Sequence, residues 1–186
     1  PLSAALNEAI RKSIKTPEWM EISPEGYIIR WYVPEQYTQG FMDKGNFAIG
    51  LDTSEAIGND DIAFVVVNLT DLSVVAAGNF NETSILTFSA FVAWFMAKYT
   101  TTTLVVERKS TGSALIGNLL SFLPTKGIDP FRRIFNWVVE RKYERNDEYR
   151  EILQDMTRRS NHWYDRYIRD FGFVTTGDRR THLYST

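Results

Sequence analysis

The fold is decided by the stretch Ile62-Ala-Phe-Val-Val-Val-Asn-Leu69, Asp71-Leu-Ser73 and Val74-Val-Ala-Ala-Gly-Asn-Phe80. Two runs rich in β-branched residues flank a short polar turn, which predicts a pair of adjacent antiparallel strands. A third such run, Phe47–Thr53, comes just before them. These three runs with short connections predict an antiparallel meander.

The segment after the meander predicts how the sheet continues. A helix is expected from a Thr83 or Ser84 cap to Tyr99, and its apolar circumference indicates burial against the sheet. A strand over Thr102–Glu107 and a helix over Ser113–Phe122 follow. A right-handed crossover places the new strand parallel to Phe47–Thr53. We therefore expect an α/β domain with a ribonuclease-H-like mixed sheet, an antiparallel meander plus a parallel strand, flanked by helices.

The ends of the chain carry weaker signals. A short helix is expected over Leu2–Ile14 and a strand over Gly26–Val33, with a polar loop before Phe47. Residues 123–171 read as an inserted pair of helices. The first starts at an Asp129-Pro130 cap and carries Phe131, Ile134, Phe135, Val138 and Val139, and the second carries Tyr149, Ile152, Leu153, Met156, Trp163, Tyr164, Tyr167 and Phe171.

Two acidic residues end apolar runs of the expected strands. Asp52 follows Ala48-Ile-Gly-Leu51, and Glu107 follows Leu104-Val-Val106. An ionised carboxylate is costly to bury unless another charge offsets its own, and Mg²⁺ or Mn²⁺ prefers oxygen ligands. If the two strands are neighbours, both acids reach one sheet edge and predict a metal site. Each acid taken alone also fits a solvent-facing strand end or a turn cap.

Composition restricts the alternatives. At 186 residues and 44% hydrophobic content, the chain fits one domain. The absence of cysteine excludes disulfides and thiolate chemistry, and two histidines make a His-rich metal centre improbable. No apolar stretch is long enough to cross a bilayer. Residues 1–125 carry a net charge of −5 and residues 126–186 a net charge of +3, which is compatible with a metal site beside a phosphate-binding surface.

Two motifs resemble one family. Gly50-Leu-Asp-Thr-Ser-Glu-Ala-Ile-Gly-Asn-Asp-Asp61 and Val105-Val-Glu-Arg-Lys-Ser-Thr-Gly112 are similar to the two acidic motifs of the C-terminal nuclease domain of the large terminase subunit, the DNA-packaging motor of tailed bacteriophages. Tyr32-Val-Pro-Glu35 resembles that family's lead-in, and Gly172-Phe-Val-Thr-Thr-Gly-Asp-Arg-Arg180 resembles a later segment. The resemblance covers roughly residues 26–122 and 172–186.

The resemblance implies a metal-dependent endonuclease that cuts concatemeric double-stranded viral DNA by two-metal hydrolysis with Mg²⁺ or Mn²⁺. Asp52 and Glu107 would be catalytic metal ligands, with Glu55, Asp60 and Asp61 as accessory ligands. The implied partners are an ATPase domain in the same full-length chain, the portal protein and the small terminase subunit, and the implied location is the host cytoplasm at the procapsid portal. Candidate DNA contacts are Arg108, Lys109, Arg132, Arg133, Arg179 and Arg180.

One departure from the family keeps alternatives open. The third acid of the family lies in a late His-Asp-Asp-like motif, and the residues after Gly177 have no such motif. We expect that this acid lies beyond Thr186, or else that Asp165, Asp170 or Asp178 replaces it. Another ribonuclease-H-like nuclease, of the resolvase or transposase type, and a non-catalytic module that docks on DNA or on the motor remain alternative readings.

Overall fold

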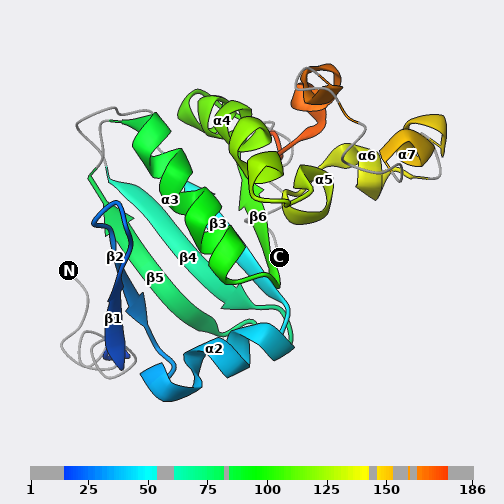
Figure 1. The fold of residues 1–186 in the computed structure, drawn as a ribbon. Helices are drawn as coiled ribbons and strands as arrows, with labels where there is room; N and C mark the ends of the chain where they lie inside the picture. Colours follow the sequence, from blue (N-terminus) through cyan, green and yellow to red (C-terminus); the bar gives the residue numbers. More distant parts are fainter. Residues whose placement is uncertain are drawn as a thin grey trace, which may run out of the picture.

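A six-stranded mixed sheet forms the centre of the protein in the computed structural model, which describes residues 15–53, 61–81, 84–142, 146–152, 159 and 163–175 (Figure 1). The strands are β1 (Trp19–Ile22), β2 (Ile28–Trp31), β3 (Phe47–Asp52), β4 (Ile62–Asn68), β5 (Val74–Phe80) and β6 (Thr102–Val106). Their spatial order is β1-β2-β5-β4-β3-β6, in which β3 and β6 are parallel and the other neighbours are antiparallel.

The predicted meander and crossover are confirmed. β3, β4 and β5 pair in sequence, and helix α3 (Ile85–Lys98) leads from β5 to β6 on the far side of β3. The expected cap is also present, since the Ser84 hydroxyl accepts a hydrogen bond from the Thr87 backbone N–H at 3.3 Å. The next helix, α4 (Thr111–Thr125), packs beside α3 on the same face of the sheet (Figure 1).

Aromatic side chains form the core between α3 and the sheet. Phe91 on α3 lies 5.5 Å from Phe64 on β4 and 5.3 Å from Phe80 on β5, measured between ring centroids, and all three rings are buried. Phe95, one helical turn further along, reaches Phe64 at 5.1 Å and Trp31 at 6.1 Å. These stacked, tilted and edge-to-face ring pairs add attraction to the burial of apolar area, so α3 is held firmly on its face of the sheet.

Two elements were missed in the sequence. Helix α2 (Glu35–Lys44) occupies part of the expected polar loop, and it follows Pro34, which has no side chain able to cap it. Only Thr38 and Met42 of this helix are buried, so its apolar pattern is too thin to predict a helix. Strand β1 was missed because its four residues include Glu21, an acid on the core face of the sheet.

Glu21 is the most buried acid of the described core, with 6% of its surface exposed. Its carboxylate accepts hydrogen bonds from Trp31 Nε1 at 2.8 Å and from the Tyr99 hydroxyl at 2.9 Å, and Lys98 forms an ion pair with it. Burial beside this carboxylate raises the pKa of Tyr99, so its hydroxyl remains a donor. The four side chains tie β1 and β2 to the end of α3.

The structure does not confirm an inserted helical hairpin in residues 123–171. The described part contains α5 (Pro130–Arg133), α6 (Trp137–Glu140), α7 (Asn146–Ile152) and the 3₁₀ helix η2 (Trp163–Asp170). The Asp129-Pro130 start is confirmed, since Asp129 accepts from Phe131 N at 3.1 Å. The first helix nevertheless breaks after Arg133, because Phe135 N donates to the Leu104 carbonyl at 2.8 Å and pairs this segment with the edge of β6.

The expected helix over Leu2–Ile14 lies outside the described residues. Among the helices that are described, none combines the length and the apolar character that a membrane span requires. Figure 1 shows the segment with α5, α6 and α7 extending beyond the β6 edge, away from β1 and β2.

We expect Glu21→Ala to lower the free energy of unfolding by about 3 kcal/mol, because Trp31 Nε1, the Tyr99 hydroxyl and Lys98 lose a common buried acceptor. Urea denaturation followed by tryptophan fluorescence measures the change. Glu18→Ala is the control, since Glu18 is exposed and should change stability by less than about 0.5 kcal/mol. Equal effects of the two substitutions would contradict a special role for the Glu21 contacts.

Candidate metal centre

Asp52 and Glu107 reach the same edge of the sheet. The parallel register of β3 and β6 pairs Ile49 with Leu104 and Leu51 with Val106. Asp52 directly follows Leu51, and Glu107 directly follows Val106. Parallel neighbours in register point to the same face, and side chains alternate along each strand. Because Leu51 and Val106 are buried against the helices, both acids belong to the opposite face. Asp52 is exposed and Glu107 is partly exposed.

The backbone at Glu107 is fixed on two sides. Phe173 N donates to the Val106 carbonyl at 3.1 Å, and Arg108 N donates to the Phe173 carbonyl at 2.7 Å, which brackets Glu107 in a parallel bridge. On the other side the first turn of α4 approaches so closely that a Cβ at Gly112 would overlap the Glu107 carbonyl oxygen. Glycine is therefore required there, and the acid is held on a rigid support.

Asp61 lies at the same end of the sheet. It immediately precedes β4, and Ala63 of β4 is paired with Asp52 on one side and with Asn79 on the other. Asn79 Nδ2 donates to Asp61 Oδ2 at 2.6 Å. Asn79 is not among the site residues predicted from the sequence. Its position in the third strand of the meander could have indicated that it lies at the same sheet end as Asp52. Its amide gives this edge a further oxygen that could face a cation.

The described residues contain no group of three or more His, Asp or Glu side chains arranged to hold a metal ion. Glu55, Asp60 and Asp178 lie outside them, so the structure does not place these candidates. Asp165 and Asp170 are described on η2, and they form no such group with Asp52 and Glu107. The paired acids alone fit a hard divalent ion that keeps several of its waters, as Mg²⁺ commonly does.

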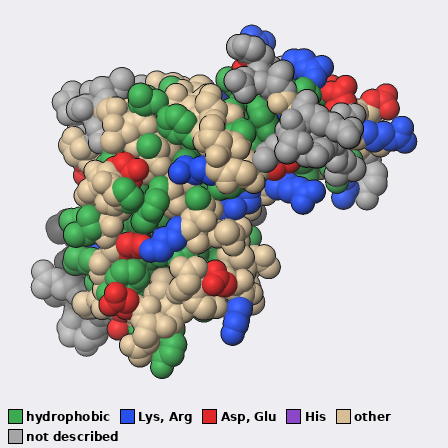
Figure 2. Space-filling model, in the orientation of Figure 1, with side chains coloured by type: hydrophobic (Ala, Val, Ile, Leu, Met, Phe, Trp, Pro, Cys, Tyr) green, Lys and Arg blue, Asp and Glu red, His purple; other side chains and the backbone are tan. Residues whose placement is uncertain are grey.

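The basic candidates separate into different environments. Lys109 and Arg132 are exposed, while Arg108 extends to the helix side of the sheet and lines a pocket under α4. Arg179 and Arg180 lie outside the described residues. Figure 2 shows Lys and Arg side chains gathered over the segment with α5 to α7, with Asp and Glu side chains among them. Such a mixed surface does not by itself indicate DNA binding.

Arg133 has a structural environment. Its Nε donates to the Thr102 carbonyl at 2.6 Å, and its Nη2 donates to the Met96 carbonyl at 2.7 Å and lies 3.1 Å from the Tyr99 carbonyl. These acceptors lie at the end of α3 and the start of β6. Burial lowers the pKa of the Arg133 guanidinium, although an arginine still keeps its proton. Since these donors join α5 to the core, we leave Arg133 out of the proposed DNA contacts.

We expect Gly112→Ala to destabilise the protein by about 2 kcal/mol, because the new methyl group would overlap the Glu107 carbonyl and push α4 away from the site. Thermal unfolding followed by circular dichroism measures it. Gly117→Ala on the same helix is the control, since its Cβ would meet only Ile168 at 3.9 Å and alanine favours helix. A drop in melting temperature for Gly117→Ala as large as that for Gly112→Ala would refute the explanation.

Arg133→Met should lower the free energy of unfolding by about 2 kcal/mol, because three backbone carbonyls lose charged donors. Arg132→Met removes the same charge from the exposed neighbouring position and should be nearly neutral. Parallel denaturant titrations of the two variants make the comparison. If Arg133→Met were as stable as the wild type, the structural role would be contradicted and Arg133 would again be a candidate DNA contact.

Comparison with known proteins leaves the site geometry as the main guide. No protein-family model matches this chain. No curated protein matches it at a significant level. The features that bear on the function of this sheet edge are therefore its own residues: two acids in parallel register, with the hydrogen-bonded pair Asp61 and Asn79 at the same end of the sheet.

Proposed function

We propose that this chain is a metal-dependent endonuclease domain of the type found in viral large terminases, with a ribonuclease-H-like arrangement of strands. The observation that carries the proposal is the register of β3 and β6, which brings Asp52 and Glu107 to neighbouring positions on one face. Adjacent strands lie about 4.8 Å apart, and carboxylates at that separation can share metal ions about 4 Å apart.

The strand order supports the ribonuclease-H-like assignment. The sheet contains the series β5-β4-β3-β6, an antiparallel meander whose first strand is also paired with a parallel strand reached through a buried helix. This is the order expected from the sequence. The additional strands β1 and β2 extend the sheet beyond β5, at the edge remote from the two acids.

Asp52 and Glu107 would hold divalent ions, and Asp61 lies at the same end of the sheet without forming a three-acid group with them in the described residues. Bound Mg²⁺ or Mn²⁺ supplies an activated water and stabilises the charge that develops on the phosphate and on the leaving oxygen. The chain's own contribution is geometric. Gly112 and the Phe173 bridge keep the Glu107 backbone fixed, so this acid projects from a rigid position before DNA arrives.

The substrate and partners of this proposal follow from the terminase resemblance. The substrate is concatemeric double-stranded DNA, and the setting is genome packaging at the procapsid portal in the host cytoplasm. An ATPase domain, the portal protein and the small terminase subunit are the proposed partners. Lys109, an exposed basic residue two positions after Glu107, is a proposed contact to the DNA backbone.

A non-catalytic module that docks on DNA or on the motor is the second candidate. It is favoured by the absence, within the described residues, of a third acid grouped with Asp52 and Glu107. A ribonuclease-H-like nuclease of another type, such as a resolvase or transposase core, would use the same two acids. Metal-dependent cleavage separates the docking module from both nucleases, and the substrate preference separates the nucleases from each other.

Wild-type protein with Mn²⁺ should nick and cut supercoiled plasmid, whereas Asp52→Asn and Glu107→Gln should each reduce the rate at least about 100-fold, because each removes a negative ligand. The gel assay is paired with Mn²⁺ titration by electron paramagnetic resonance, which reads metal binding without cleavage. Asp43→Asn is the matched control, since Asp43 is exposed on α2 and accepts a hydrogen bond from Gln39 there.

Two results are informative beyond simple success. Mn²⁺ binding that depends on Asp52, without any cleavage by the wild type, would support the docking module. Equal cleavage by wild type and Asp52→Asn would contradict the nuclease proposal, because the activity would then come from elsewhere. Linear double-stranded DNA and a four-way junction, offered in competition, distinguish the terminase reading from the resolvase reading.

A further inference from the structure

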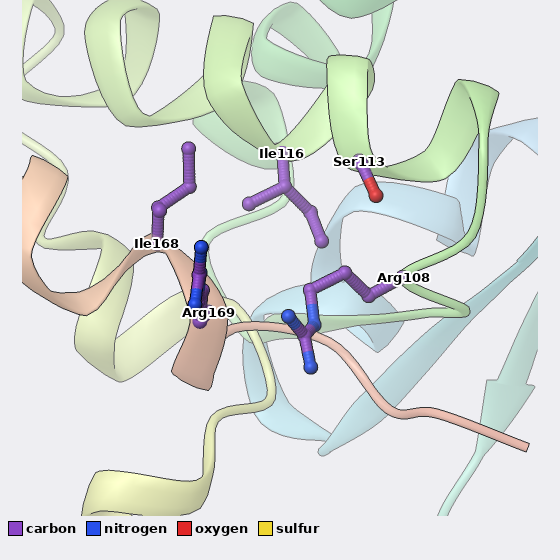
Figure 3. A pocket seen from close by; sticks show the side chains of 5 residues that line it. All are labelled: Arg108, Ser113, Ile116, Ile168 and Arg169. Atoms are coloured by element: carbon purple, nitrogen blue, oxygen red, sulfur yellow. The ribbon is translucent and has the colours of Figure 1, made fainter.

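A pocket with two arginines lies on the helix side of the sheet, behind the candidate metal centre. Its volume is about 170 Å³, and Arg108, Ser113, Ile116, Ile168 and Arg169 line it (Figure 3). Arg108 comes from the loop after β6, Ser113 and Ile116 from α4, and Ile168 and Arg169 from η2. The loop after β6 and the start of α4, which follow each other in the chain, therefore meet the distant helix η2 at one small cavity.

The charge of this pocket is not neutralised by the residues that line it. Arg108 Nε is buried and has no hydrogen-bond partner. Arg169 has neither a hydrogen bond nor an ion pair with another described residue, and no carboxylate belongs to the lining. Two guanidinium groups that share a cavity repel each other, and a buried donor without a partner is costly. An anion in the pocket would relieve both penalties.

The chemistry of the lining favours a tetrahedral oxyanion. A guanidinium presents several N–H donors in a plane and binds phosphate oxygens in pairs, and the Ser113 hydroxyl adds a donor from the first turn of α4. The N–H groups of Gly112 and Ser113 already donate to the carbonyls of Lys109 and Ser110, so side chains would carry the recognition. A water occupies about 30 Å³ in the liquid, so the cavity has room for a phosphate and a few waters.

Close backbone contacts around Gly172 hold the walls of the pocket in place. Gly172, at φ +74°, passes with its backbone between β6 and α4, where a Cβ would come within 2.8 Å of the Val106 carbonyl and 3.3 Å of the Arg108 Cβ. Phe173 then pairs with the strand end at Glu107 and Arg108. The pairing of Phe173 with this strand end thus positions both Glu107, which belongs to the open face of the sheet, and Arg108, which lines the pocket.

We propose that this pocket binds a phosphate group and, resting on the proposed nuclease function, that the phosphate belongs to the backbone of the DNA near the cut. Glu107 and Arg108 are consecutive residues, so a DNA strand with a phosphate bound in the pocket would pass the sheet edge where Asp52 and Glu107 lie. Arg169 is then a DNA-binding residue contributed by η2.

The direct test is isothermal titration calorimetry without divalent metal. Inorganic phosphate is titrated into the wild type, Arg169→Gln and Arg166→Gln proteins. Arg166 lies on the same 3₁₀ helix but interacts with Glu151 and the Trp163 ring outside the pocket. We expect wild type and Arg166→Gln to bind phosphate with similar affinity, and Arg169→Gln to bind about 10-fold more weakly, since one charged contact is lost. The matched pair also cancels the general stabilisation that phosphate salts give to any folded protein.

The DNA source is tested with a fluorescent duplex in Ca²⁺ or in no metal. Arg169→Gln should reduce the slope of log affinity against log salt by about 1, while Arg166→Gln leaves it unchanged, and inorganic phosphate should compete with the duplex. No phosphate binding by wild type, or equal losses in the two variants, would overturn the pocket. Phosphate binding that a duplex cannot compete would overturn the DNA source.

Failure of the nuclease proposal would look different. In that case plasmid cleavage is absent or independent of Asp52, yet wild type still binds phosphate more tightly than Arg169→Gln does. Arg169 is exposed and its replacement should not lower the melting temperature in chloride, so weaker phosphate binding can be assigned to the pocket rather than to unfolding.

Discussion

The parallel pairing of β3 with β6 is the constraint on which the rest of the structure depends. It requires the chain to leave the meander, cross the sheet through α3 and return beside the first strand of the meander. α3 can serve as this crossover because its aromatic side chains fill the core over β4 and β5. Once this pairing sets the register, Asp52 and Glu107 follow paired residues of the two strands and reach the same edge of the sheet.

The end of β6 separates an acidic residue on one side of the sheet from a basic residue on the other. Glu107 lies on the face that the helices leave open, and Arg108 faces α4, because consecutive residues of an extended chain point in opposite directions. Gly112 and Gly172 let two backbones approach this point more closely than any side chain would permit. Two acidic residues and a basic pocket are thereby placed on opposite sides of one strand end, as the proposed nuclease function would require.

The sequence was a good guide where periodicity was strong and local. The meander, α3 with its Ser84 cap, and the Asp129-Pro130 helix start follow from short-range rules, and all are present. Helix α2 was missed because few of its residues are buried, and β1 because a buried acid broke its pattern. The helix through Ile134 was expected from an apolar stripe, but pairing with Leu104 took its backbone hydrogen bonds. Tertiary contacts outweigh local propensity in such cases.

The sequence by itself determined the strands of the meander, the buried crossover helix and the pair of acids that end two apolar runs, because these depend on the order and polarity of neighbouring residues. Only the tertiary structure decided that Arg133 serves the core, that Asn79 stands beside Asp61, and that Arg169 joins Arg108 in one pocket. Those relations link residues that are tens of positions apart, and chain packing alone sets the distances between them.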